Sequence, residues 1–349
     1  MSRMPTGSLV HVVVPDAVHD PMRPSGGNAY DRRVCDLLPD AGWRVRGHAV
    51  PDAWPRLGAA GRQALARLAP RIPDGALVLV DGLIAEAGAQ VLVPLARRAR
   101  LVVLVHSVPE RPAAADVLGA ARAVIATSGW VRDQLRHGRP LPPCTVRVAE
   151  PGVDPGPVAR GTAHGGELLC VGSVAPHKGH DVLLAALAEL SRLRWHCRCV
   201  GSLDHDVSYA TTMCRAARRA GLADRVRFAG PLTGAQLDAA FASADVLVHP
   251  ARVEGYGMVV TEALARALPV ITTAAGGLPD ALGTTPDGER AGLLVQPGDA
   301  TELAGALSAW LTDRGLRGRL RRAARVRRGQ LRTWSATVDE IASVLRAAS

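Results

Sequence analysis

The sequence predicts an α/β protein made of two doubly wound domains. Short, continuous apolar runs alternate with helix-like segments along the chain, and a proline- and glycine-rich segment separates two halves that each open on an apolar run and a glycine-bearing loop. Continuous apolar strands are typical of parallel sheets that helices cover on both faces. With 349 residues, the chain also exceeds the size at which one hydrophobic core stops growing, so two domains are expected.

Short apolar runs mark the predicted strands. They lie at residues 10–14, 77–80, 101–105, 124–126, 168–171, 197–200, 226–228, 246–249, 270–273 and 293–295. Successive parallel strands are expected to be joined by right-handed crossovers. In folds of this class, ligands bind beyond the carboxyl ends of the strands, so we look for functional residues in the loops that follow them.

The predicted domain boundary lies in the segment "PGVDPGPVARGTAHGG", residues 151–166, which has no apolar periodicity. We expect a first Rossmann-like domain over residues 1–155 and a second over residues 156–328. A C-terminal helix over residues 329–349 is expected to pack back toward the first domain. The two domains are expected to face each other across a central cleft.

Composition favours a cytoplasmic protein. The only apolar run in residues 1–15 covers residues 9–14, which is shorter than the core of a signal peptide or a membrane span. The cysteines form no Cys-x-x-Cys pair, which favours reduced, buried thiols over a disulfide framework or a zinc site. They are Cys35, Cys144, Cys170, Cys197, Cys199 and Cys214.

The formal charge of +10 favours anionic ligands, and the arginine-rich segment 314–332 is a candidate patch for nucleic acid or anionic lipid. Leu311, Leu316, Leu320 and Leu331 occur along it at roughly helical spacing. The chain also has only three tyrosines and two phenylalanines with which to stack bases. A solvated helix face is therefore favoured, with no specific nucleic-acid partner and at most weak association with anionic membranes.

Lysine occurs once in the chain, at Lys178, among 42 basic residues. It lies in "APHKGHD", residues 175–181, between a predicted strand and a helix with an apolar stripe, and its neighbours His177 and His180 are expected to be solvated. The Gly-x5-Lys-Gly spacing differs from that of the Walker loop. A compact ammonium group at the carboxyl end of a strand still suits a phosphate oxygen, for which the planar fork of arginine is no replacement.

A second candidate site lies at residues 249–280, where a glycine-rich loop after a strand carries Glu254. The backbone N–H groups that would begin the next helix and bind an anion there belong to Gly257, Met258 and Val259. Glu262 lies one turn into this helix, so two carboxylates flank a predicted anion site. Carboxylates repel an anion, but they can accept hydrogen bonds from hydroxyl groups. A ligand with hydroxyl groups on both sides of its phosphates would therefore suit this site, and a nucleotide sugar is such a ligand.

These segments resemble the retaining glycosyltransferases of the GT-B fold, which has two Rossmann-like domains, and within them family 4 (glycosyl transferases group 1). The Glu-x7-Glu signature of the family corresponds to Glu254 and Glu262, and its lysine motif to residues 172–179. The other similar segments are "GGNAY" at 26–30, "LVHSVPE" at 104–110, "AARAVIATSGWVRDQL" at 120–135 and "EPGVDPG" at 150–156. The resemblance covers nearly the whole chain, and its specific motifs lie in the second half.

The resemblance implies that the first domain binds an acceptor and the second a nucleotide-diphosphate sugar, with a UDP-sugar favoured. Lys178 would stabilise the leaving diphosphate, Glu254 would bind the transferred sugar, and His106 would lie near the anomeric carbon, which makes these three the implied catalytic residues. Glu262 would bind the ribose hydroxyls. The other implied donor-binding residues are Gly27, Ser173, Leu232, Gly255, Tyr256, Gly257, Met258 and Val259.

Family 4 enzymes work without a metal or another cofactor, so a cation of the protein must stabilise the leaving diphosphate. Transfer would retain the configuration of the sugar, and the leaving phosphate oxygen would take the proton of the acceptor hydroxyl. The acceptor stays open between a small molecule, a glycan and a lipid. Ser173 stands where an arginine is usual; either Arg252 or an arginine of the first domain replaces it, or donor affinity depends more on Lys178 and the helix start.

Several alternatives stay open. Asp204 and Asp206 form an Asp-x-Asp pair, the metal-binding signature of the other glycosyltransferase fold, although an aspartate-rich turn is the commoner cause of such a pair. A sugar-nucleotide epimerase of the same fold would need no separate acceptor. A non-catalytic protein would bind nucleic acid or an anionic membrane through residues 314–332. A dinucleotide oxidoreductase is disfavoured because no Gly-x-Gly-x-x-Gly follows a predicted strand.

Overall fold

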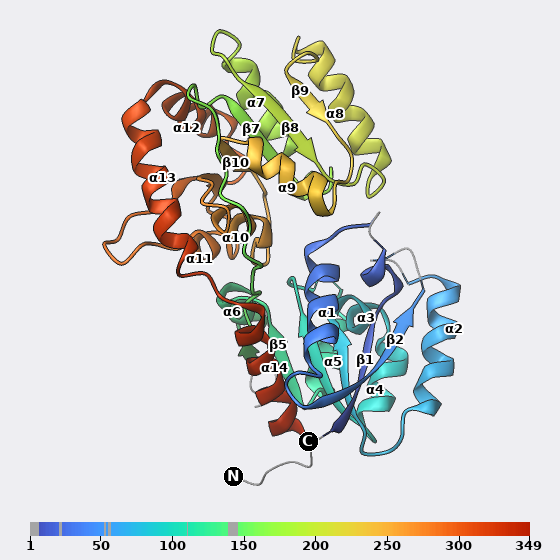
Figure 1. Ribbon diagram of the computed structural model, residues 1–349. Coiled ribbons are helices and arrows are strands. Elements are labelled where there is room, and N and C mark those ends of the chain that lie inside the picture. Colours follow the sequence, from blue (N-terminus) through green and yellow to red (C-terminus); the bar gives the residue numbers. More distant parts are fainter. Residues whose placement is uncertain (1–6, 21–22, 52–53, 55–56, 110, 139–145) are drawn as a thin grey trace. The chain divides into compact units, whose positions relative to one another are not determined.

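The computed structural model describes residues 7–20, 23–51, 54, 57–109, 111–138 and 146–349, and its strands form two six-stranded parallel sheets (Figure 1). Of the described residues, the first unit contains 7–20, 26–152 and 332–349, and the second unit contains 23–25 and 153–331. The predicted α/β class with two Rossmann-like sheets is therefore confirmed. Cys144 and Glu110, the last residue of "LVHSVPE", lie outside the described residues.

The sheet of the first unit has the strand order β2-β1-β3-β4-β5-β6. Its strands are β1 (Ser8–Pro15), β2 (Trp43–Val50), β3 (Leu77–Asp81), β4 (Arg100–Val105), β5 (Ala123–Ala126) and β6 (Val146–Val148). Its helices are η1 (Asp16–His19), α1 (Gly26–Leu37), α2 (Ala59–Leu68), η2 (Ala69–Arg71), α3 (Gly82–Ala87), α4 (Ala89–Ala96), α5 (Ala114–Ala120), α6 (Gly129–Gly138) and α14 (Trp334–Ala348). The order reverses between β1 and β3, which is where flavodoxin-like sheets bind ligands.

The sheet of the second unit has the order β12-β11-β10-β7-β8-β9. Its strands are β7 (Glu167–Val171), β8 (His196–Val200), β9 (Val226–Phe228), β10 (Val246–His249), β11 (Val270–Thr273) and β12 (Gly292–Val295). Its helices are η3 (Pro176–Lys178), α7 (His180–Glu189), α8 (Val207–Arg219), α9 (Gly234–Ser243), α10 (Met258–Leu264), α11 (Leu278–Leu282), α12 (Ala300–Thr312) and α13 (Arg314–Arg328). This is the Rossmann order, and it reverses between β7 and β10.

Every predicted apolar run forms a strand, and two strands, β2 and β6, were not predicted. Both lie at the edges of the first sheet. In β2 only the end residues Trp43 and Val50 are buried, and the sequence between them mixes arginine, glycine and histidine with apolar residues. A half-exposed edge strand lacks the continuous apolar pattern by which the other strands were recognised.

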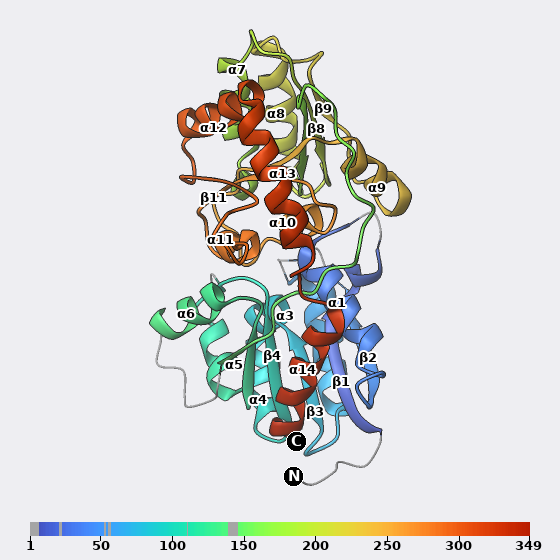
Figure 2. The same ribbon diagram turned by 60° about the vertical axis from the view of Figure 1, so that its left-hand side comes forward.

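The C-terminal helix α14 packs within the first unit, where it contacts α1, β4 and β5 (Figure 2). The Trp334 ring meets the edge of Tyr30 at a centroid distance of 5.5 Å. The hydroxyl of Thr337 donates a 2.7 Å hydrogen bond to the carbonyl of Glu150. A β-carbon on Gly152 would lie 2.3 Å from the backbone nitrogen of Trp334, so only glycine permits this close approach. The first unit is therefore completed by the end of the chain.

The arginine-rich helix α13 buries Leu320, Ala323 and Ala324 against the core. Arg317 is buried and donates hydrogen bonds to the carbonyls of Trp310 and Leu311. The arginines exposed on the opposite side are Arg314, Arg319, Arg322 and Arg325. Of the helices in the described part of the chain, none combines the length and the apolar character needed to cross a bilayer.

Candidate functional site

Lys178 lies in a tight loop at the carboxyl end of β7. The loop forms the 3-10 turn η3 and ends at Gly179, which has φ +71° and immediately precedes α7. A β-carbon on Gly179 would lie 2.0 Å from the carbonyl oxygen of Pro250, the residue that follows β10. Glycine is required here because the loops after β7 and β10 touch through their backbones, at the point where the strand order reverses.

This contact brings Lys178 to Glu254. The ammonium nitrogen Nζ of Lys178 lies 2.5 Å from Oε2 of Glu254, and Nε2 of His249 lies 3.1 Å from the same oxygen. The Lys178 and Glu254 side chains are each 18% exposed, and that of His249 is 2% exposed. Burial alone would raise the pKa of Glu254, but Lys178 and His249 outweigh it and hold this pKa well below its usual range. Burial lowers the pKa of His249.

The backbone of Glu254 is held by the loop after β11. Gly276 has φ +57°, and a β-carbon there would lie 1.9 Å from the carbonyl oxygen of Glu254. The same oxygen accepts a 3.1 Å hydrogen bond from the N–H of Gly277. Three loops, after β7, β10 and β11, therefore fix the Lys178–Glu254 pair, as expected for a site that must be rigid.

The helix predicted after Glu254 is α10, a single helix of seven residues that begins after Gly257, where φ is +102°. Gly255, Tyr256 and Gly257 are buried. Four other residues that the resemblance implies for donor binding are half-buried. Met258 and Val259 lie in the first turn of α10, and Ser173 and Leu232 lie in loops elsewhere in the same unit.

Glu262 lies on α10 and is half-buried. Burial raises the pKa of Glu262 to about 7. The charge of Arg266 lowers this pKa, and the charge of Asp154 raises it, but both effects are smaller than that of burial. The Arg266 guanidinium donates a 3.0 Å hydrogen bond to the backbone carbonyl of Glu262. The carboxyl group of Glu262 is therefore easily protonated near neutral pH, unlike that of Glu254, and in its protonated form it can donate a hydrogen bond.

Arg252 is already paired in this structure. Its guanidinium forms two hydrogen bonds to the carboxylate of Asp181, at 2.7 and 2.6 Å, and a third to the carbonyl of Pro176 at 3.0 Å. The Arg252 side chain lowers the pKa of Asp181 to about 2. Of the two arginine replacements considered for the position of Ser173, Arg252 is therefore disfavoured.

The expectation that both histidines beside Lys178 are solvated is wrong for one of them. His177 is exposed, but His180 is only 1% exposed and begins α7. The turn at Gly179 directs the chain into the core immediately after Lys178.

His106 is the centre of a second charged cluster, in the first unit. It follows β4, Asp81 ends the neighbouring strand β3, and Asp31 lies on α1. Nε2 of His106 lies 2.8 Å from Oδ1 of Asp31 and 3.3 Å from Oδ2 of Asp81. Burial alone would lower the pKa of His106, but the two carboxylates raise it to about 10. The imidazole is therefore a protonated hydrogen-bond donor at neutral pH.

The surroundings of His106 fix its ring. Asp81 accepts hydrogen bonds from the N–H groups of Leu83 and Ile84 at the start of α3. The rings of Tyr30 and His106 pack in a T-shaped arrangement, with their centroids 5.1 Å apart. A β-carbon on Gly27 would lie 3.4 Å from Cδ2 of His106, so this implied residue adjoins the cluster.

Sequence reasoning missed Asp31 and Asp81. Asp81 had a signal that could have been used, because it is a carboxylate directly at the end of the apolar run 77–80. Asp31 had a weaker one, since it directly follows the "GGNAY" segment and lies on α1. His249 was seen as a strand end and not as a partner of Glu254; only the folded loop reveals that contact.

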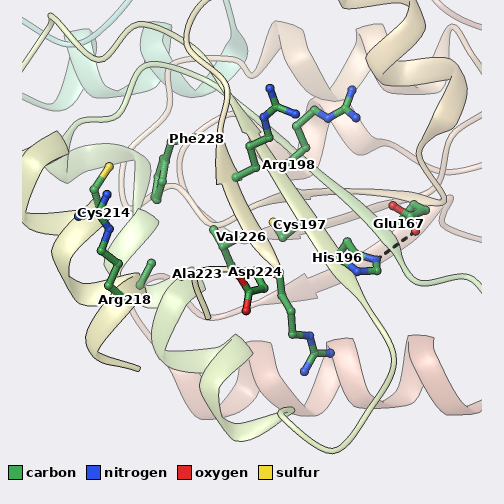
Figure 3. A pocket seen from close by; sticks show the side chains of 13 residues that line it. Glu167, His196, Cys197, Arg198, Cys214, Arg218, Ala223, Asp224, Val226 and Phe228 are labelled. Carbon is green, nitrogen blue, oxygen red and sulfur yellow. Dashed lines mark ion pairs between the residues drawn. The ribbon is translucent and has the colours of Figure 1, made fainter. Parts of the chain in front are cut away.

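One member of the Asp-x-Asp pair has a structural role. Asp206 caps α8 by accepting a 2.9 Å hydrogen bond from the N–H of Tyr209, and the N–H of Asp204 donates to the hydroxyl of Ser202. A shallow pocket in the same unit lies along β8 and β9, with the ion pair of His196 and Glu167 in its wall (Figure 3). None of the predicted site residues lines this pocket.

The family of the second half is shown by sequence comparison. Residues 164–327 match the family model described as "Glycosyl transferases group 1", and this segment, which holds Lys178, Glu254 and Glu262, belongs to that family. D-inositol 3-phosphate glycosyltransferase of Salinispora tropica is 32% identical over 253 residues, 66% of this chain and 52% of that protein. The protein of the same name from Kineococcus radiotolerans is 33% identical over 259 residues, 67% of this chain and 59% of that protein. The chain thus spans little more than half the length of these relatives.

Solved structures share the whole fold. Sucrose-phosphate synthase from Thermosynechococcus elongatus superposes with a TM-score of 0.80 at 24% identity, covering 98% of this chain and all of that one. Anabaena HepE in complex with UDP and glucose superposes with a TM-score of 0.74 at 19% identity, covering 97% of this chain and all of that one. These likenesses confirm the predicted GT-B class of the fold.

Proposed function

We propose that this protein is a metal-independent, retaining glycosyltransferase that moves a sugar from a nucleotide-diphosphate sugar, with UDP-sugar the first choice, to an acceptor hydroxyl. The observation that carries the proposal is the Lys178–Glu254–His249 cluster at the reversal of strand order in the second unit. A Rossmann sheet binds its ligand at this point. The family match of residues 164–327 supports the same conclusion.

Lys178 serves as the cation for the leaving diphosphate. An ammonium group has three hydrogen-bond donors. One is given to Glu254, and two are left for phosphate oxygens, whose negative charge grows as the glycosidic bond breaks. Glu254 orients Lys178 and accepts hydrogen bonds from the hydroxyls of the transferred sugar. Lys178 and His249 lower the pKa of Glu254 more than burial raises it. The carboxylate therefore stays ionised and accepts hydrogen bonds throughout the reaction.

In the first unit, His106 donates a hydrogen bond to a sugar hydroxyl, because its raised pKa keeps it protonated. Glu262 binds the ribose hydroxyls, and the leaving phosphate oxygen takes the proton of the acceptor on the same face of the sugar. The acceptor to test first is D-inositol 3-phosphate, because several relatives are named D-inositol 3-phosphate glycosyltransferase.

A thermal-shift panel tests the donor. We expect UDP or UDP-sugars to raise the melting temperature more than GDP, ADP or dTDP and their sugars, because a ligand that binds only the folded state stabilises it by mass action. The absence of a shift with every nucleotide would overturn the proposal. Activity that EDTA abolishes and Mn²⁺ restores would overturn the metal-independent mechanism, and an isomerised nucleotide sugar formed from donor alone would favour an epimerase.

A further inference from the structure

A cluster of potential metal ligands in the core of the second unit has no part in the proposed function. Cys170 on β7 and Cys199 on β8 lie opposite each other in the parallel register, so their thiols are on the same face of the sheet. His180, the first residue of α7, reaches the same point, with Nε2 3.8 Å from Sγ of Cys170. The two sulfurs and the nitrogen all lie within 4.8 Å of one another.

The spacing of these atoms fits a metal ion. Zinc–sulfur bonds of about 2.3 Å and zinc–nitrogen bonds of about 2.0 Å place a sulfur and a nitrogen ligand about 3.5 Å apart at the tetrahedral angle. The observed distance between Sγ of Cys170 and Nε2 of His180 is 3.8 Å, about 0.3 Å longer than this. An ion could therefore be accommodated with small side-chain movements.

The three candidate ligands are buried. Cys170, Cys199 and His180 are 2%, 1% and 1% exposed, in a core of valine and leucine side chains. Nδ1 of His180 is buried and has no hydrogen-bond partner in the described part of the chain. An ion bound through Nε2 would leave Nδ1 without a partner, so the placement of the three ligand atoms is what favours an ion.

We propose that Cys170, His180 and Cys199 bind Zn²⁺ as a structural ion. Two thiolates and a neutral imidazole balance the charge of Zn²⁺, whereas Cu⁺ would leave a net negative charge in an apolar core. Binding replaces the two thiol protons, which pass to solvent, by two zinc–sulfur bonds, and nothing is oxidised or reduced.

Zinc at this position would hold the Lys178 loop. His180 is separated from Lys178 by Gly179 alone, so an ion that ties His180 to β7 and β8 also fixes the start of α7. The ion would be structural and would have no contact with the donor sugar. The proposal therefore stands or falls independently of glycosyl transfer.

Metal content tests the proposal. We expect the full chain, produced in zinc-supplemented medium, to contain about one zinc per molecule by mass spectrometry, as one three-ligand site requires. Cys170→Ala and Cys199→Ala should lose this zinc. Cys197→Ala is the matched control, because Cys197 lies on β8, on the same face as Cys199 and equally buried, but outside the ligand group. Wild-type protein without zinc, or zinc that is retained in Cys170→Ala or lost equally from Cys197→Ala, would overturn the site; bound copper in place of zinc would overturn the choice of ion.

A spectroscopic measurement covers variants that fail to fold. Wild-type protein refolded with Co²⁺ in place of Zn²⁺ should show a thiolate-to-cobalt charge-transfer band and a higher melting temperature than protein refolded with chelator. The band should be absent from His180→Gln, which keeps both thiols. No band in the wild type would contradict the proposal, even if nucleotide sugars bind normally.

Discussion

The two units each place a charged cluster at the carboxyl end of a parallel sheet, but the clusters have opposite compositions. In the first unit a histidine, His106, lies between the carboxylates of Asp31 and Asp81. In the second unit a carboxylate, Glu254, lies between Lys178 and His249. Similar sheets therefore carry inverse charge patterns.

This difference determines which histidine carries a proton. The two carboxylates raise the pKa of His106 to about 10, although burial alone would lower it. No carboxylate other than Glu254 contacts His249 among the described residues, and burial lowers the pKa of His249. The first cluster thus presents a protonated imidazole as a hydrogen-bond donor, and the second presents lysine as its cation. Four substitutions test this contrast.

Lys178→Ala should have the largest effect. We expect a loss of about 100-fold or more in kcat/KM, because one preorganised cation is removed from the leaving diphosphate and Glu254 loses its lysine partner. Steady-state kinetics with the donor identified by thermal shift would measure it. Lys178→Arg, which keeps the charge but not the compact shape, should recover only part of the loss. Near wild-type kcat/KM in the alanine variant would sink the assignment.

Glu254→Gln should lower kcat about 10- to 100-fold, because the amide no longer holds Lys178 as an ion pair. It should also change the acid stability of the protein. The pKa of Glu254 is depressed in the folded state, so its stabilising contribution is present above the ordinary carboxyl pKa of about 4.3 and is lost as pH falls below that value. Melting temperatures between pH 6 and 3 should therefore fall less steeply in the variant. Parallel curves would contradict the ion pair.

Asp31→Asn should lower the pKa of His106 by about one unit or more, because one of its two carboxylates is removed. Stability from the raised pKa of His106 is present below the ordinary histidine value of about 6.5 and lost as pH rises through about 10. In the variant this loss should be smaller and should be complete at a lower pH. NMR titration of the imidazole measures the pKa directly, with Asp36→Asn, an exposed change on the same helix, as control. An unchanged His106 pKa in Asp31→Asn would disprove the coupling.

Arg252→Ala should have the smallest effect. The guanidinium is committed to Asp181, and the two side chains are 37% and 40% exposed, so the stability change should be about 0 to 1 kcal/mol. The KM for the donor should change less than about 3-fold, the scale of a lost surface contact. A tenfold rise in donor KM would show instead that Arg252 serves as the missing arginine.

The sequence was sufficient to predict what depends on local pattern. Strands buried on both faces are continuous apolar runs, so they were recognised, whereas the half-exposed edge strand β2 was not. Lys178 and Glu254 were recognised because each lies in a loop with its own glycines. Their direct contact could not be predicted, since they are 76 residues apart and meet only because β7 and β10 are neighbours.

The same limit applies to the other clusters. Asp31 is 75 residues from His106, and no spacing rule joins a residue of α1 to the end of β4. Cys170, His180 and Cys199 come from three different elements, β7, α7 and β8, without the close cysteine pairs by which zinc sites are usually recognised. Strand order and register decide such contacts, and these are properties of the sheet as a whole.

The position of α14 has a consequence for how the protein is made. A ribosome releases the chain from its N-terminus, so residues 153–331 emerge before the helix that packs on Tyr30 and Glu150. The half that is synthesised first can therefore finish folding only after the half that is synthesised second has left the ribosome. Until then, the surface of α1, β4 and β5 that α14 covers is exposed during translation, and this is the stage at which a chaperone would have something to bind.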